Sequence, residues 1–158
     1  MTIKNMQTVE RTEIKLVGYT VTVSLNEDIE TGIVVNLREK LIENLNKVTK
    51  RSEHKGFYLV QIYPDEEWTP DVAFESIVAV EVIDFDPIPE GFVRRIIPAG
   101  TYVKVSHKGP ESEIEQTYHS IREEGIAAFR SFDMEYWADF DSLEKEDNII
   151  DIYLPFEA

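Results

Sequence analysis

Residues 16–24 read Leu16-Val17-Gly18-Tyr19-Thr20-Val21-Thr22-Val23-Ser24, and residues 98–106 read Pro98-Ala99-Gly100-Thr101-Tyr102-Val103-Lys104-Val105-Ser106. The glycine, two valines and the final serine recur at one constant offset. After each stretch the chain continues with an amphipathic helix pattern and two further strand patterns. A duplicated half-domain creates a seam, and a seam between two sheets can hold a small molecule. We therefore look for a binding site at this seam.

Side-chain patterns in the first half predict strands on both sides of a helix. Val17, Val21 and Val23 alternate with smaller or polar neighbours, which is typical of a half-buried strand. Leu37 and Leu41 belong to an apolar stripe with the three-to-four-residue spacing of an amphipathic helix. The predicted elements are a strand over Glu13–Ser24, a helix over Val34–Val48, and strands over Gly56–Tyr63 and Phe74–Val82.

A stiff linker separates the two halves, because residues 84–91 contain two prolines and a glycine. In the second half, Ser112 and Glu115 have the spacing of a capping box. The predicted elements are a strand over Phe92–Ser106, a helix from Ser112, and strands over Met134–Phe140 and Asn148–Phe156. Each half would be marginal alone. We expect one α+β domain over residues 1–158, with repeat one at about 12–84, a linker at 85–91 and repeat two at about 92–157.

Composition excludes several classes of function. The formal net charge of -15 disfavours direct binding to nucleic acid. The chain has no cysteine and no long apolar run, so we expect a cytoplasmic protein without membrane insertion. Its three histidines lack the spacing of metal ligands, and no glycine-rich phosphate loop is present. We therefore predict no metal and no cofactor.

The most suggestive polar side chain lies in the strand predicted from Met134. Alternation places Glu135 and Trp137 on one face of this strand and Met134 and Tyr136 on the other. If the first face looks into the seam, burial would raise the pKa of Glu135. The carboxylate could then accept a proton or receive a cationic ligand. The alternative is a solvated acid beside an aromatic residue at the rim.

Tyrosines supply further candidates. Alternation in the last strand turns Tyr153 away from the face that packs on a helix, so Tyr153 could share the space with Glu135. Its phenol could stabilise negative charge on a carbonyl oxygen; alternatively, it is an edge tyrosine with a hydrated hydroxyl. The remaining candidate ligand-binding aromatics, for each of which core packing is the alternative, are Tyr19, Tyr58, Tyr63, Trp68 and Tyr102.

Several short motifs, in this order and spacing, resemble the GyrI-like small-molecule-binding domains, which also serve as effector-binding modules of multidrug-responsive transcription activators. The motifs are Pro98–Val103, His107–Gly109, Thr117–Tyr118, Met134–Trp137 and Ile152–Pro155. The resemblance implies two β-α-β-β repeats related by a pseudo-twofold axis, with a ligand cleft between them. It also implies that Glu135 receives lipophilic cations. Because the first strand begins near residue 12, we expect no helix-turn-helix and no transcription factor.

Three functions follow from this resemblance and these residues. The first is a stand-alone protein that binds aromatic, often cationic, compounds through Glu135, Trp137 and the tyrosines, and so protects against drugs or other xenobiotics. The second is a hydrolase that opens the cyclopropane of DNA-alkylating natural products, with Glu135 as general base and Tyr153 holding the substrate carbonyl. The third, by family analogy alone, is a modulator that interacts with DNA gyrase.

Overall fold

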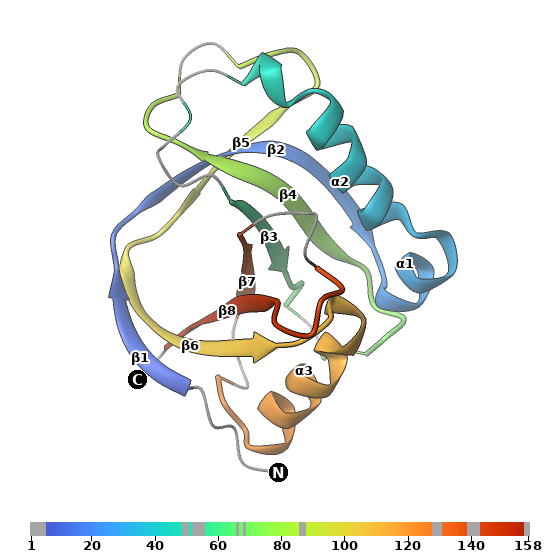
Figure 1. The fold of residues 1–158 in the computed structure, drawn as a ribbon, viewed down its shortest axis with the longest axis vertical. Coiled ribbons are helices and arrows are strands. Elements are labelled where there is room, and N and C mark those ends of the chain that lie inside the picture. The colour runs from blue at the N-terminus through green and yellow to red at the C-terminus, as the bar shows by residue number, and fades with distance from the viewer. Residues whose placement is uncertain are drawn as a thin grey trace.

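The fold is built from an antiparallel sheet and helices packed on it (Figure 1). A computed structural model describes residues 6–48, 51, 56–65, 67, 69–85, 88–127, 131–138 and 143–156. The strands are β1 Met6–Arg11, β2 Ile14–Val23, β3 Phe57–Ile62, β4 Phe74–Val82, β5 Val93–Ile97, β6 Gly100–Lys108, β7 Phe132–Trp137 and β8 Ile149–Pro155. The helices are α1 Leu25–Thr31, α2 Ile33–Glu43 and α3 Ile114–Glu123, with short 3-10 turns η1 Leu45–Lys47 and η2 Glu111–Glu113. The predicted α+β class is confirmed.

The described strands form one sheet in the order β1-β6-β8-β7-β3-β4-β2-β5. β1 pairs with β6 as far as Arg11 opposite Gly100, and β2 pairs with β5 from Ile14 opposite Ile97. The register is the same on both sides of this short break. The pairing of β1 with β6 and that of β2 with β5 therefore form one long ladder, which brings β1 and β5, the two ends of the strand order, together. The sheet curves into a ring with an inner and an outer face (Figure 1).

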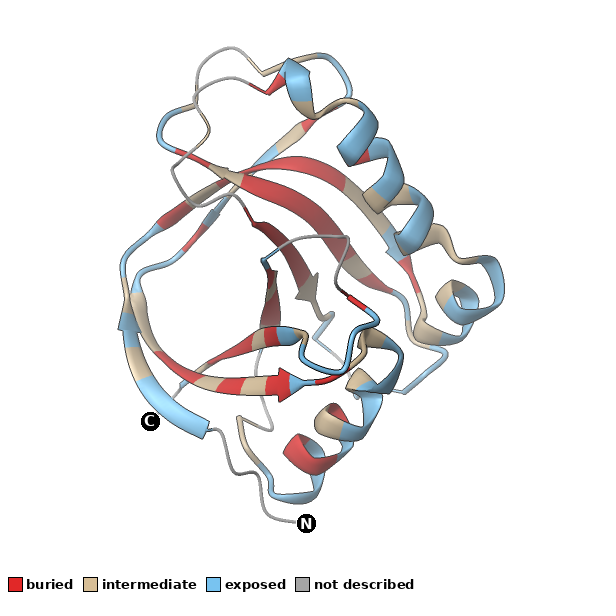
Figure 2. Ribbon diagram, in the orientation of Figure 1, coloured by how far each residue is buried: buried red, intermediate tan, exposed pale blue. Residues whose placement is uncertain are grey.

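Successive side chains of each strand point to opposite faces of the curved sheet, so separate groups of buried residues pack on its inner and outer faces. Three groups of buried residues pack in this way. The inner group includes Leu16, Val60, Ile77, Met134 and Tyr153. On the outer face, one group includes Val17, Leu59, Val80, Trp137 and Ile150 with Leu41 of α2, and another includes Val105, Ile152 and Leu154 with Tyr118 and Ile121 of α3. Most strands are therefore largely buried, whereas β1 and one side of the helices are exposed (Figure 2).

Two elements of the first half were not predicted. Strand β1 has mostly exposed polar side chains, such as Gln7 and Glu10, so it carries no clear apolar alternation. Helix α1 begins where Ser24 accepts a hydrogen bond from the backbone of Glu27, and it ends at Gly32 in the left-handed conformation. It buries no residue, so it lacks the apolar stripe that indicated α2. The predicted helix to Val48 instead ends at Glu43 and continues as η1.

The second half differs from its prediction in three respects. Strand β7 covers Phe132–Trp137 instead of Met134–Phe140, and the predicted end at Phe140 lies outside the described residues. The strand predicted over 92–106 is interrupted and forms β5 and β6, each paired with a different strand. The capping box predicted at Ser112 is absent: α3 begins after Glu113, which makes no side-chain cap hydrogen bond. Ser112 instead donates from its hydroxyl to Glu144 at 2.8 Å. A tertiary contact has replaced the local one.

The two similar stretches, residues 16–24 and 98–106, occupy unequal places in the sheet. Gly18 lies inside β2, where an added Cβ would come 2.0 Å from the carbonyl oxygen of Val78. Gly100 is the first residue of β6, and an added Cβ would meet nothing within 4 Å. The strand order is nevertheless symmetric. If each of β1–β4 is replaced by its counterpart in β5–β8 and the reverse, the order read from the other end is unchanged. An internal repeat with a pseudo-twofold axis stays a prediction, and these two stretches are not its equivalent positions.

Candidate functional site

Strand β7 carries the polar residues of the candidate site. Asp133, Glu135 and Trp137 alternate along β7, and all three are buried. Trp137 packs in the outer group with Ile150 and with Leu41 of α2. Opposite Glu135 lies Ile152, which packs with α3. The acid therefore lies on the outer, helix-covered face of the sheet, between residues that contact the two helices.

Glu135 accepts hydrogen bonds from two neutral donors. The hydroxyl of Tyr118 on α3 donates to Oε2 at 2.6 Å, and the indole Nε1 of Trp137 donates to Oε1 at 3.0 Å. Glu135 is only 4% exposed. No basic side chain pairs with Glu135 in the ranges that the structure describes. Two neutral donors thus hold the acid in place, and none of the described basic side chains compensates its charge.

Burial controls the protonation of this acid. Loss of hydration raises the pKa of Glu135 to about 7, although the hydrogen bonds from Tyr118 and Trp137 lower it. The nearby carboxylates of Asp133 and Glu111 raise it further. Burial also raises the pKa of Tyr118 well above 10, so its hydroxyl keeps the proton and stays a donor. Glu135 can therefore accept a proton near neutral pH or attract a cation when ionised.

Side chains from the first half contact the two residues that flank Glu135 on its face of β7. The guanidinium of Arg38 on α2 lies 4.9 Å from the centre of the Trp137 ring. It also forms a 2.8 Å ion pair with Glu111 of η2. Asp133 accepts a 2.6 Å hydrogen bond from the hydroxyl of Tyr63. The first half thus contributes a cation and a phenol to a site whose acids come from the second half.

The predicted partnership of Tyr153 with Glu135 is wrong. Tyr153 of β8 lies opposite Met134 of β7, whereas Glu135 lies opposite Ile152. Directly opposed residues of antiparallel strands share a face. Tyr153 accordingly packs in the inner group, under the guanidinium of Arg11 at 4.1 Å. The sheet itself separates the two side chains.

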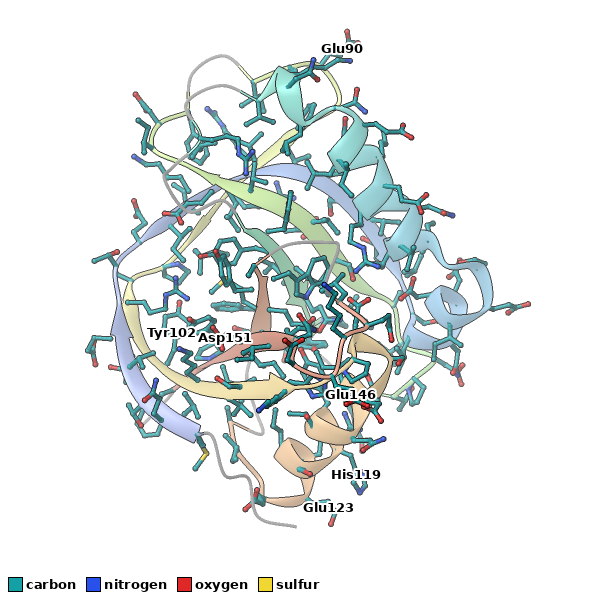
Figure 3. The ribbon with its side chains drawn as sticks, in the orientation of Figure 1. Glu90, Tyr102, His119, Glu123, Glu146 and Asp151 are labelled. Atoms are coloured by element: carbon teal, nitrogen blue, oxygen red, sulfur yellow. The ribbon has the colours of Figure 1, made fainter. Side chains whose placement is uncertain are left out.

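The remaining predicted aromatics are divided between the faces. Tyr58 and Tyr102 belong to the inner group, and Figure 3 shows Tyr102 within the ring of strands. Tyr19 lies on the outer face against Phe92. Tyr63 contacts the row of β7 side chains that contains Glu135, because its hydroxyl donates to Asp133. Trp68 lies outside the described residues.

Tyr118 is the site residue that the sequence reasoning did not assign. It belongs to the buried group that packs α3 against the sheet, and it is only 6% exposed. Its hydroxyl is the signal that could have identified it, because a buried phenol usually needs a hydrogen-bond partner. The partner is Glu135, 17 residues further along the chain. Only helix packing against β7 brings the two together.

Three further features bear on other kinds of site in the described residues. No cluster of three or more His, Cys, Asp or Glu able to hold a metal occurs within the described segments. None of the helices described is long and apolar enough to cross a membrane. The buried His107 is held by Thr117 and by the carbonyl of Pro110 at 2.7 and 2.9 Å, as expected of a structural residue.

The fold and the acid in an aromatic, helix-covered setting define a small-molecule-binding domain of mixed α+β architecture. Residues 4–157 match the GyrI-like small molecule binding domain. The chain belongs to this family, as its motifs indicated.

The chain is also similar to individual proteins, one in sequence and others in structure. The transcriptional regulator BrlR of Pseudomonas aeruginosa is 29% identical over 92 residues, covering 54% of this chain and 34% of that protein. The match thus spans about a third of the regulator's length. The structure of SAV2435 bound to tetraphenylphosphonium superposes with a TM-score of 0.75 at 15% identity, covering 98% of this chain and 95% of that one. The EcmrR C-terminal domain superposes at 0.70 and 17% identity, with 97% of each chain covered.

A more distant likeness extends to proteins named as enzymes. A hydrolase from Listeria innocua superposes with a TM-score of 0.53 at 9% identity, over 96% of this chain and 91% of that one. At such low identity these structural likenesses show the shared fold alone.

Proposed function

We propose that this protein binds lipophilic aromatic cations on the outer face of its sheet, with Glu135 as the charged receptor, and that it protects a cell from such compounds. The observation that carries the proposal is the buried carboxyl of Glu135, held by Tyr118 and Trp137 without a basic partner in the described structure. A lipophilic cation supplies both the missing charge and an apolar surface to match the indole. Sequestering such a compound lowers its free concentration, a role that we place in the cytoplasm.

Access to this acid from between the halves is part of the proposal. Tyr118 of α3 donates to Glu135, and Arg38 of α2 lies over the ring of Trp137, so the two helices contact this pair of residues from different halves of the chain. A ligand entering between these helices would meet Trp137 and then Glu135. A cleft at this place is part of the proposal. It is supported by the tetraphenylphosphonium bound to a relative of the same fold.

Calorimetric titration with tetraphenylphosphonium at pH 8 tests the proposal, because Glu135 is then largely ionised. We expect saturable binding that weakens at least about tenfold in Glu135→Gln, since the variant lacks the compensating charge. Glu123→Gln is the matched control, because it removes one negative charge from an exposed position on α3 (Figure 3). Equal affinity in Glu135→Gln and wild type would show that the cation does not bind at this acid.

A second candidate function is hydrolysis of cyclopropanoid DNA-alkylating compounds. The observation that favours it is the pKa of Glu135 near 7, which suits a general base at neutral pH. In this reaction Glu135 takes a proton from water, and the water oxygen bonds to a cyclopropane carbon. The strained carbon–carbon bond breaks, and its electron pair moves into the conjugated carbonyl group. Tyr153, predicted to hold the substrate carbonyl, lies on the other face of the sheet, and the phenol on the face of Glu135 is Tyr118, whose hydroxyl orients the acid.

Mass spectrometry distinguishes turnover from binding. A cyclopropanoid compound is incubated with sub-stoichiometric protein, beside Glu135→Gln and Tyr153→Phe. Conversion of many equivalents to the water adduct, lost only in Glu135→Gln, would establish an enzyme. No conversion above the buffer control would leave binding as the function for that compound class. An effect on DNA gyrase without any ligand stays a prediction from family analogy.

A further inference from the structure

Trp137, the aromatic residue beside Glu135 in the proposed site, already contacts a cationic side chain. The guanidinium of Arg38 lies 4.9 Å from the centre of the Trp137 ring, within the range of a cation–π contact. The side chain of Arg38 is only 14% exposed, so water weakens this contact little. The same indole donates to Glu135 at 3.0 Å. One aromatic ring is therefore shared by the receptor acid and a resident cation.

An ion pair holds this cation in place across the two halves. Arg38 belongs to α2, and its partner Glu111 belongs to η2 on the other half. Their 2.8 Å separation and partial burial make this contact stronger than an exposed surface pair. Glu111 also acts on Glu135, because its negative charge raises the pKa of that acid. Arg38 thus neutralises a carboxylate that would otherwise add to the attraction for an external cation.

We infer that Arg38 is a specificity-determining residue that occupies the ligand's position on Trp137, so that a bound cation must displace it, and that the preferred ligands are planar, delocalised cations. A guanidinium is planar and weakly hydrated, and it stacks on aromatic rings more readily than an ammonium. A planar aromatic cation replaces this stacking directly. Once Arg38 leaves, Glu111 becomes available as a second acid. The inference rests on the proposed function of Glu135.

Two substitutions of Arg38 distinguish the effect of its charge on ligand affinity from the effect of its stacking on Trp137. Arg38→Met removes both the charge and the planar group, whereas Arg38→Lys keeps the charge and removes the planar group. The probe is proflavine, a planar acridinium, titrated by fluorescence and calorimetry. We expect roughly tenfold tighter binding in Arg38→Met and a smaller but clear gain in Arg38→Lys, from the loss of a partly buried cation–π contact. Arg122→Met, an exposed arginine of α3, is the control and should stay within about twofold of wild type.

Nuclear magnetic resonance of the arginine side chain reports displacement directly. The Nε–Hε signal of Arg38, assigned by its absence in Arg38→Lys, should shift on addition of proflavine as the guanidinium leaves the indole ring. Thermal unfolding of each variant verifies that α2 is intact. Unchanged affinity in Arg38→Lys together with a static signal would overturn the inference while leaving Glu135-dependent binding in place. If Glu135→Gln leaves the affinity for proflavine unchanged in the wild type and in both Arg38 variants, the proposed function would be overturned as well.

Discussion

Replacing Glu135 by glutamine should change how the stability of this protein depends on pH. Burial raises the pKa of Glu135 from an ordinary value of 4.5 to about 7. The folded state therefore holds this proton more tightly than the unfolded state. The resulting stabilisation is fully present below pH 4.5 and is lost as pH rises through 7. Between pH 5 and pH 9, the wild type should lose about 2.5 kcal/mol that the variant does not lose.

The absolute stability of Glu135→Gln depends on a second effect. A glutamine can accept the hydrogen bond of Tyr118 through its oxygen, but its amide then presents a donor to the indole N–H of Trp137. One buried donor without a partner costs about 1–3 kcal/mol at every pH. The variant should therefore be the less stable protein at pH 5, and the difference should shrink or reverse by pH 9.

Urea unfolding at half-unit intervals from pH 5 to pH 9, followed by tryptophan fluorescence and circular dichroism, measures this difference. Other titrating groups are common to both proteins and cancel when the free energies of unfolding are subtracted. Glu123→Gln, which removes an exposed carboxylate, provides the control for a change of net charge. A wild-type-minus-variant difference that stays constant within about 0.5 kcal/mol over this range would refute the raised pKa.

Three further outcomes follow from the same structure. Tyr118→Phe removes a hydrogen bond that favours ionised Glu135, so the pKa of Glu135 should rise and tetraphenylphosphonium affinity at pH 7 should fall roughly fivefold, as calorimetry over pH 6–9 would show. Tyr153→Phe should leave that affinity within about twofold, because Tyr153 lies on the inner face; a tenfold loss would contradict the observed register. Gly18→Ala should destabilise the protein by at least about 2 kcal/mol in urea unfolding, since its Cβ would meet the carbonyl oxygen of Val78 at 2.0 Å. A cost below about 0.5 kcal/mol would show that β2 and β4 can separate locally.

Sequence patterns predicted the secondary structure correctly where it depends on the residues of a single element. The alternation of Val17, Val21 and Val23 predicted β2 nearly to the residue, since side-chain alternation is a property of a single strand. The predicted strand over Phe74–Val82 coincides with β4. The same reasoning failed at β1, whose exposed side chains depend on pairing with β6 for their structure. It also failed at Ser112, where Glu144 from a distant loop replaced the expected cap.

The sequence by itself determined that Glu135 and Trp137 share a face, because side chains two residues apart in a strand must point the same way. Only the tertiary structure decided which residues of other elements join them. Strand β8 pairs with β7 so that Ile152, and not Tyr153, lies opposite Glu135. A register slip of one residue would have reversed that choice, since every side chain of the strand would change face. Packing of α3 supplied Tyr118 instead, because burying its apolar stripe brought the phenol to the acid.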